Sequence, residues 1–234
     1  MIVGADATDG RVWLLLPRTD YEIVDTWYVS GLKGSGSKDI QIKDAFVPNH
    51  RVLERERGGD EERTAWEIHQ TDRYRMPLHV LLGWDLAGPM IGIAQGTIEE
   101  FMSLLAGTSG PGRTADSDAV QLRLSQASAE VDAARSLMSS DLREILELAG
   151  NGDEFSTMDR ARFRRDKAFV AKLCLSAVNG LWELGGGHAI FESGRLQRYH
   201  RDIQAAVRRD RFIMELGGLQ YGRVALGLEP DGRI

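Results

Sequence analysis

The chain has 234 residues, a formal net charge of −6, and ordinary globular shares of hydrophobic (42%) and charged (27%) residues. This acidic balance argues against general binding to nucleic acid or to an anionic membrane surface. A single cysteine, Cys174, excludes an intrachain disulfide and a cysteine-ligated zinc cluster. No apolar run reaches the roughly 18 residues of a transmembrane helix, and the N-terminus lacks signal-peptide features. We therefore expect a soluble, cytoplasmic protein without a metal site.

The first fifty residues are typical of short strands, because they contain small clusters of aromatic and β-branched residues between turn signals. The predicted strands are 12–16, 21–24, 27–29, 39–43 and 45–47. Residues 31–37, GLKGSGS, hold three glycines in seven positions and predict a turn. This turn lacks the lysine–hydroxyl ending of a nucleotide-binding P-loop, and a strand follows it instead of a helix. Strands this short predict a small sheet with little core of its own.

A charged stretch separates these strands from the rest of the chain. Its centre, RERGGDEER at 55–63, is typical of a solvated connection. We therefore predict three parts: a partial β-domain over 1–52, a charged linker over 53–73, and a helical domain over 74–234.

Four apolar patterns with helical spacing fill the helical domain. The first begins near Pro77 and should kink at Pro89. The second covers 118–148, and the third begins at the capping signal 156–159. Because short connections join them, the helices should form an up-down four-helix bundle, and the fold class is α+β, mainly α.

The third and fourth helices carry most of the positive charge. Arginines and a lysine crowd residues 160–167, which we interpret as a solvated face or a subunit contact. The fourth helix takes its apolar face from residues between Tyr199 and Leu216, and Gly217–Gly218 should weaken it.

Two glycine-rich segments are candidate ligand sites. Gly185, Gly186 and Gly187 end the third helix, and glycine lets a ligand approach the backbone, whose N–H groups can bind an anion. The alternative there is an ordinary helix end followed by a solvated loop. Before the second helix, Arg113 follows Ser-Gly-Pro-Gly, where a cation beside a helix start can bind phosphate. The alternative is an exposed loop arginine.

Three stretches of the chain resemble one family. They are DTWYVSGLKGSGSKDIQIKDAFVP at 25–48, RTADSDAVQLRLSQASAEVDAAR at 113–135, and LGGG, LQRYHRDIQAA and YGRVALG between 184 and 227. Together they are similar to the flavin-dependent monooxygenases with an acyl-CoA dehydrogenase fold, the two-component group. The resemblance covers nearly the whole chain and matches only the C-terminal part of such enzymes. In them, a helical domain and the first part of the β-domain come before this point.

The resemblance implies a cofactor and partners. Enzymes of this group use reduced FMN or FAD and O₂ to oxygenate a small aromatic or related organic substrate, and a separate reductase supplies the reduced flavin. The arginine that matches Arg113 reaches the flavin phosphate of a neighbouring subunit, which implies a homo-oligomer, a dimer or tetramer. The same comparison makes Gly185, Gly186, Gly187 and Ser37 candidate cofactor-binding residues.

The resemblance also exposes a departure at the catalytic position. The family usually has a histidine eight residues after the arginine of its Arg-Asp pair, and counting from Arg201 gives Arg209. An arginine cannot move a proton at neutral pH, although it can stabilise an anionic flavin or phenolate. Asp210 stands near the carboxylate base of acyl-CoA dehydrogenases, and His200 is a further candidate. Two alternatives therefore stay open: an acyl-CoA dehydrogenase-like flavoenzyme, or a non-catalytic oligomerising bundle subunit.

Overall fold

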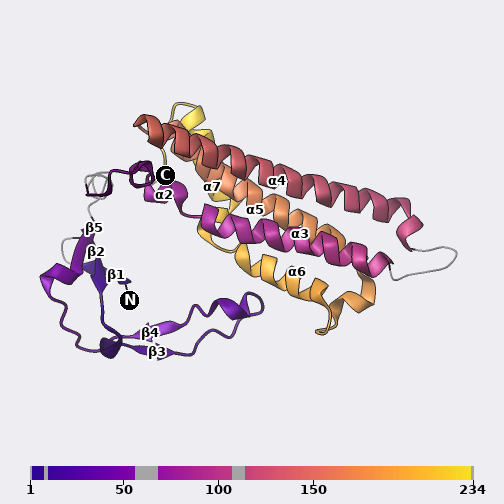
Figure 1. The fold of residues 1–234 in the computed structure, drawn as a ribbon, viewed down its shortest axis with the longest axis horizontal. Coiled ribbons are helices and arrows are strands. Elements are labelled where there is room, and N and C mark those ends of the chain that lie inside the picture. Colours follow the sequence, from indigo (N-terminus) through magenta and orange to yellow (C-terminus); the bar gives the residue numbers. More distant parts are fainter. Residues whose placement is uncertain (1, 8–9, 56–67, 107–113, 233–234) are drawn as a thin grey trace. The chain divides into compact units, whose positions relative to one another are not determined.

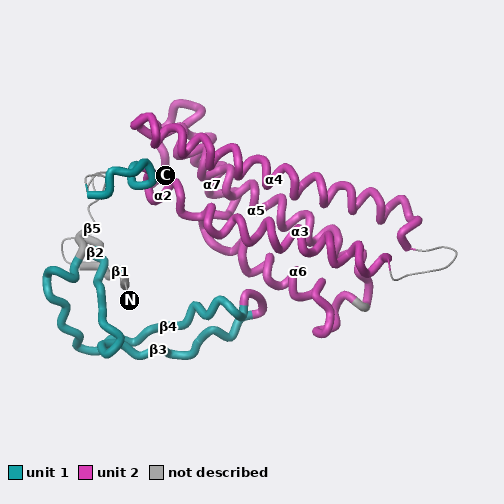
Figure 2. The backbone as a smooth tube through the Cα atoms, in the orientation of Figure 1, with its two compact units in different colours: residues 1–29, 33–75 teal, residues 30–32, 76–234 magenta. Residues whose placement is uncertain are grey.

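The computed structural model describes residues 2–7, 10–55, 68–106 and 114–232 (Figure 1). These residues divide into two compact units (Figure 2). The first unit comprises residues 1–29 and 33–75 and holds the strands. The second comprises residues 76–234 together with the tripeptide 30–32. The described elements confirm the predicted α+β, mainly helical class.

The first unit contains two small antiparallel sheets. One has the order β1-β2-β5, formed by β1 (Ile2–Ala7), β2 (Gly10–Leu15) and β5 (Val52–Arg55). The other pairs β3 (Glu22–Val24) with β4 (Asp39–Gln41). Leu16 is buried, whereas Tyr28 and Phe46 are 85% and 83% exposed. The described part of this unit therefore buries few large side chains.

Two predicted strands are wrong, because residues 27–29 and 45–47 lie outside any strand. The strand β5 was not predicted; it begins at Val52, the last residue of the predicted β-domain, and ends at Arg55. The first error has a local cause. The N–H of Thr26 donates to Val24 O, and the N–H of Tyr28 donates to Thr26 O. Bonds between residues two apart make tight turns, so the backbone here bonds to itself and forms no ladder.

The second unit is a helical bundle. It contains the short α2 (Leu78–Leu81) and the long helices α3 (Trp84–Ala106), α4 (Asp118–Asn151) and α5 (Thr157–Leu184). Two shorter helices, α6 (Arg195–Ala206) and α7 (Met214–Ala225), complete it. The helices α3, α4, α5 and α6 run alternately back and forth (Figure 1). The up-down bundle is therefore confirmed.

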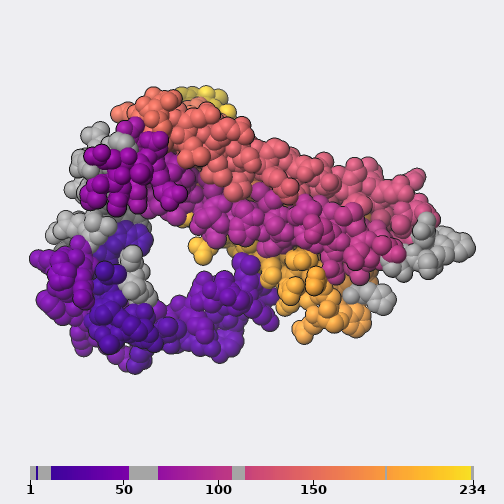
Figure 3. Space-filling model, viewed as in Figure 1, coloured from indigo at the N-terminus to yellow at the C-terminus, as the bar shows by residue number. Residues whose placement is uncertain are grey.

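Helix α5 is the centre of the bundle, since it contacts α3, α4, α6 and α7. Its core positions Phe163, Val170, Cys174 and Leu181 have no exposed surface. In the space-filling view, side chains of α3 and α4 meet along their length on one face (Figure 3). Burial raises the pKa of the Cys174 thiol to about 12. The structure therefore places this cysteine in the core, where its thiol is unreactive.

The ends of α4 and α5 follow from local sequence. Helix α4 stops at Gly152, which has the left-handed φ of 75° that glycine adopts without strain. Ser156 then starts α5 through a capping box, because its side chain accepts the N–H of Asp159 while the Asp159 carboxylate accepts the N–H of Ser156. The predicted start of the third helix is confirmed.

The first predicted helix is divided. Helix α2 ends at Leu81, and α3 begins at Trp84 after Gly83, whose φ is 110°. The Gly83 N–H donates to the Asp85 carboxylate over 2.8 Å, which starts the new helix. Pro89 lies inside α3 on an exposed position, where the carbonyl it leaves unpaired can face water. The break therefore falls at the glycine and not at the proline.

The fourth predicted helix is also divided, into α6 and α7. Arg209 is extended, with φ −75° and ψ 141°, and Phe212 turns into the core within the short 3₁₀ helix η7 (Asp210–Phe212). Helix α7 runs straight through Gly217–Gly218. A Cβ on Gly217 would lie 3.0 Å from the carbonyl oxygen of Arg164, so this glycine allows α7 to approach α5 closely.

Candidate functional site

The stretch around residue 31 and the stretch around residue 201 meet within the helical unit. The Leu32 N–H donates to the Asp202 carboxylate over 2.7 Å. Gly31 is buried, and a Cβ on it would lie 2.0 Å from the carbonyl oxygen of Arg201. Only glycine permits this approach of two backbones. Two of the three stretches that carried the family resemblance are therefore in direct contact.

The three glycines after α5 differ in what surrounds them. Gly185 donates its N–H to Trp182 O, and a Cβ on it would lie 2.6 Å from the Ala189 Cβ. Gly186 has a φ of 57°, and both Gly186 and Gly187 are exposed, with no atom within 4 Å of an added Cβ. The backbone of Gly186 and Gly187 is thus open to a ligand, whereas Gly185 serves close packing.

The candidate catalytic pair lies at the other end of α6. Arg209 and Asp210 are both exposed in the connection to α7, and Asp210 Oδ1 accepts the N–H of Arg211 over 3.0 Å. Helix α6 has 12 residues and is therefore about 18 Å long. It separates this pair from the glycines that precede it (Figure 1). The described chain does not bring Gly186–Gly187 and Arg209–Asp210 to one place.

His200 lies in the middle of α6 and packs against α5. Its ring stacks on Trp182 with centroids 4.5 Å apart and an angle of 12° between the planes. The Gln204 amide, which donates to Asn179 Oδ1, lies 3.4 Å from His200 Nε2. Burial lowers the pKa of His200, so the ring is neutral at pH 7 and belongs to a packed contact.

Ser37 and Arg113 are the two remaining candidates. Ser37 is exposed and follows η2 (Lys33–Ser35), after Gly36 with its φ of 64°. Arg113 falls outside the described residues, so the structure does not place it.

The sequence interpretation did not predict a cluster of buried charged residues. We read residues 160–167 as a solvated or subunit-facing surface, but Asp166 and Lys167 are 2% and 3% exposed. Lys167 Nζ donates to the carbonyl oxygens of Val80, Leu82 and His79 over 2.5, 3.1 and 3.3 Å. Burial, and after it the charge of Arg211, lower the pKa of Lys167 to about 7.

Asp141, on α4, is the third buried member of this cluster. Arg162 donates to Asp141 Oδ1 over 3.2 Å and to Glu144 Oε1 over 2.5 Å. Burial and the neighbouring carboxylate of Asp166 raise the pKa of Asp141 to about 7. One sequence signal existed: Asp141 lies three residues after Met138 and four before Ile145, on the apolar face. These contacts join α4 to α5 and are structural.

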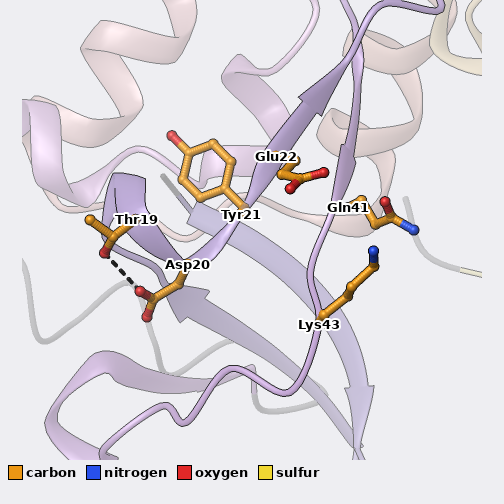
Figure 4. Close-up of a pocket in the computed structure, with 6 residues that line it drawn as sticks. All are labelled: Thr19, Asp20, Tyr21, Glu22, Gln41 and Lys43. Atoms are coloured by element: carbon orange, nitrogen blue, oxygen red, sulfur yellow. Dashed lines mark hydrogen bonds between the residues drawn. The ribbon is translucent and has the colours of Figure 1, made fainter.

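A shallow pocket lies on the β3–β4 hairpin, in the first unit (Figure 4). It has a volume of about 200 Å³, below the roughly 300 Å³ at which small-molecule sites begin. Its lining is polar and of mixed charge: Thr19, Asp20, Tyr21, Glu22, Gln41 and Lys43. Thr19 Oγ1 donates to Asp20 Oδ1 over 2.8 Å. The pocket is too small and polar to enclose an aromatic ring system.

Among residues 2–7, 10–55, 68–106 and 114–232, no group of three or more His, Cys, Asp or Glu is arranged to hold a metal ion. None of the helices in these segments is both long and apolar enough to span a membrane.

Comparison with known proteins gives consistent matches. The family model for "Acyl-CoA dehydrogenase, C-terminal domain" matches residues 85–209. The chain is 32% identical over 233 residues to the oxygenase component of an FADH(2)-dependent resorcinol hydroxylase from Rhizobium sp. (strain MTP-10005), covering 94% of this chain and 57% of that protein. It is 30% identical over 229 residues to the oxygenase subunit HsaA of a flavin-dependent monooxygenase from Rhodococcus jostii (strain RHA1), covering 94% and 60%.

Solved structures match over almost the whole chain. The crystal structure of 3-HSA hydroxylase from Rhodococcus sp. RHA1 superposes with a TM-score of 0.88 at 27% identity, covering 99% of this chain and 62% of that one. The structure of XiaF from Streptomyces sp. in complex with FADH2 and glycerol has a TM-score of 0.87, covering 99% of this chain and 60% of that one. At 23% identity, XiaF supports the fold alone. The chain spans less than two thirds of the length of these relatives.

Proposed function

Because the chain belongs to the family of acyl-CoA dehydrogenase C-terminal domains, we propose that it is the C-terminal part of the oxygenase component of a two-component flavin-dependent monooxygenase. The observation that carries this proposal is the 32% identity over 233 residues to the Rhizobium resorcinol hydroxylase oxygenase component. The proposed reaction places one atom of O₂ on a small aromatic substrate and releases the other as water. Reduced FAD or FMN supplies the electrons when bound, and a separate reductase provides it.

The described residues fit part of a flavin site. The exposed backbone of Gly186 and Gly187 can face the anionic phosphate of a flavin. The exposed guanidinium of Arg209 can hold an anionic group at the other end of α6. Because α6 keeps these two places about 18 Å apart, we propose that neighbouring protomers complete each site. Arg113 is the residue proposed to reach across to the phosphate.

Proton handling distinguishes this chain from the family it belongs to. Arg209 stays protonated at neutral pH, so its proposed role is to stabilise an anionic flavin or phenolate and not to move a proton. His200 is neutral and packed against Trp182. Asp210 is exposed, with one carboxylate oxygen accepting the Arg211 N–H. We therefore expect this chain alone to be a poor monooxygenase that releases hydrogen peroxide.

The second candidate is a non-catalytic subunit that assembles through its helices. The observation that favours it is the packing of His200, the histidine of α6, on Trp182. An acyl-CoA dehydrogenase-like activity would need Asp210 as its base, and this exposed carboxylate already accepts the Arg211 N–H.

Flavin titration tests the proposal. Reduced and oxidised FAD and FMN are titrated into the purified chain, and binding is followed by absorbance and fluorescence. Arg113→Ala should weaken binding by about 1.5–3 kcal/mol if it makes a charge-assisted contact. The matched control Arg143→Ala removes an exposed arginine of α4. Absence of binding by all four species would contradict the flavin function and leave the non-catalytic subunit.

A second measurement separates the two candidates where flavin binds. Oxygen consumption with reduced flavin and a phenol is scored as hydroxylated product against hydrogen peroxide. We expect peroxide to dominate, and efficient coupled hydroxylation would contradict the role given to Arg209. Light scattering should give a dimer or tetramer, and a 26.0 kDa monomer would contradict the proposed shared site.

A further inference from the structure

The tripeptide 30–32 belongs to the helical unit although it is far from the helices in sequence. The Leu32 N–H donates to Asp202 Oδ1 across 170 residues, over 2.7 Å. This distance lies within the range of an N–H···O hydrogen bond. Beside it, Gly31 meets the backbone of Arg201 so closely that no side chain would fit. Adjacent residues of α6 thus hold adjacent residues of the tripeptide.

Leu32 adopts a conformation that leucine avoids. Its φ is 54°, in the left-handed region, where the Cβ of an L-residue crowds the backbone. Such a conformation persists where the surrounding structure holds it. Asp202 supplies that hold, because its carboxylate is the acceptor for the Leu32 N–H.

Helix formation does not explain an aspartate at position 202. Asp202 lies in the second half of α6, which ends at Ala206. Aspartate has a poor propensity for helix interiors, and a negative charge near a helix C-terminus opposes the helix dipole. The hydrogen bond from the Leu32 N–H explains an aspartate at this position, whereas helix stability does not.

We propose that Asp202 is a positioning residue that fixes the start of the 33–37 turn. The 3₁₀ helix η2 begins at Lys33, directly after Leu32, and Ser37 follows it. Because consecutive Cα atoms are 3.8 Å apart, the place and direction of Leu32 determine where this turn begins. The cofactor-binding role given to Ser37 in this turn rests on the proposed function. The hydrogen bond between Leu32 and Asp202 does not depend on that function.

Hydrogen exchange of the Leu32 amide tests the contact without any flavin. In the full chain, Asp202→Ala should raise the exchange rate of that amide at least tenfold, and trypsin should cleave faster after Lys33. Asp202→Asn keeps an oxygen acceptor of the same shape and should restore most of the protection. The control Asp132→Ala removes an exposed aspartate of α4 and should change neither.

Two outcomes would overturn the proposal. One is an unchanged Leu32 exchange rate in folded Asp202→Ala. The other is a uniform rise across all helices that Asp202→Asn fails to reverse, because Asp202 would then stabilise the bundle in general. If Asp202→Ala does not fold, Asp202→Leu takes its place, because leucine has a similar volume and no oxygen acceptor: Leu32 exchange should rise selectively, and an unchanged rate would contradict the contact.

A functional arm tests the link to the cofactor. Where the wild-type chain binds flavin, Asp202→Ala should weaken that binding about tenfold, and Asp202→Asn should recover it. Unchanged flavin affinity in Asp202→Ala, together with faster Leu32 exchange, would overturn the cofactor role of the turn. If the wild-type chain binds no flavin, the proposed function fails, while the exchange experiment still decides the role of Asp202.

Discussion

Lys167 Nζ lies 2.5 Å from the carbonyl oxygen of Val80, a residue 87 positions earlier in the chain. The other two acceptors, His79 O and Leu82 O, come from the same short segment at α2. The last carbonyls of a helix have no partner within the helix. An ammonium group has three donors, and here all three satisfy such carbonyls. A buried lysine of α5 therefore caps α2 at the break before Gly83.

The first prediction concerns Lys167→Met. The unfolded chain keeps the lysine proton up to a pKa of 10.5, whereas burial lowers the pKa of folded Lys167 to about 7. Between these values the unfolded state binds more protons, so the stability contributed by Lys167 rises with pH. The difference in free energy of unfolding between wild type and variant should therefore change in favour of the wild type by up to about 1.4 kcal/mol per pH unit in this window.

Urea unfolding between pH 6 and 9 measures this difference. The control is Lys172→Met, which removes an exposed lysine of the same helix. A wild-type advantage that falls as pH rises would contradict the assigned direction of the pKa shift.

The second prediction concerns Asp141→Asn and has the opposite sign. The pKa of Asp141 rises from 3.8 to about 7 on folding, chiefly through burial and then through Asp166. The folded state therefore binds more protons between these values, and the stability contributed by Asp141 is complete below pH 4 and lost as pH rises to about 7. Because Asp141→Asn does not titrate, its free energy of unfolding should rise relative to that of the wild type as pH increases across this window.

Thermal and urea unfolding at pH 4, 5.5 and 7.5 test it, with Asp132→Asn as the exposed control on α4. A wild-type advantage that grows from pH 4 to 7.5 would show that pairing with Arg162 outweighs the burial of the carboxyl.

The third prediction separates two neighbouring glycines. Gly185→Ala would place its Cβ 2.6 Å from the Ala189 Cβ and 2.9 Å from the Leu196 Cδ2. Overpacking of this kind should lower the free energy of unfolding by about 1–3 kcal/mol. Gly187→Ala meets no atom within 4 Å and should change stability by about 0.5 kcal/mol or less. Equal effects in denaturant unfolding would contradict the distinction between a packing glycine and an open one.

Much of the fold was accessible from the sequence for a physical reason. Helices α4 and α5 carry long apolar faces, and the capping box at Ser156 is a local signal, so neither depends on distant residues. The resemblance to flavin-dependent monooxygenases is confirmed as well. It succeeded because the matching stretches extend along nearly the whole chain.

The wrong predictions concern features that depend on contacts between residues far apart in the sequence. Lys167 looked solvated within a charged run, but its acceptors begin 88 residues earlier, at His79. The segment between α6 and α7 contains neither glycine nor proline. The chain turns there because Phe212 is buried. Gly185 and His200 lie in packed contacts, and their candidate roles toward a cofactor or substrate stay predictions.

The last prediction concerns the stack of His200 on Trp182. Burial lowers the pKa of folded His200 below its ordinary 6.5. As pH falls below 6.5, the unfolded chain takes up the proton first, so the stability contributed by His200 is lost as pH falls through the folded pKa. His200→Phe keeps an aromatic ring on Trp182 and does not titrate. The wild type should therefore lose stability relative to His200→Phe between pH 6.5 and 5.

The ring resonances of His200, identified by their absence in the variant, should titrate with a midpoint below 6.5, and His50→Phe identifies an exposed histidine for comparison. A midpoint above 6.5 would mean that the indole face stabilises the imidazolium more than burial opposes it, and the neutral ring assigned to the α5–α6 contact would then be wrong.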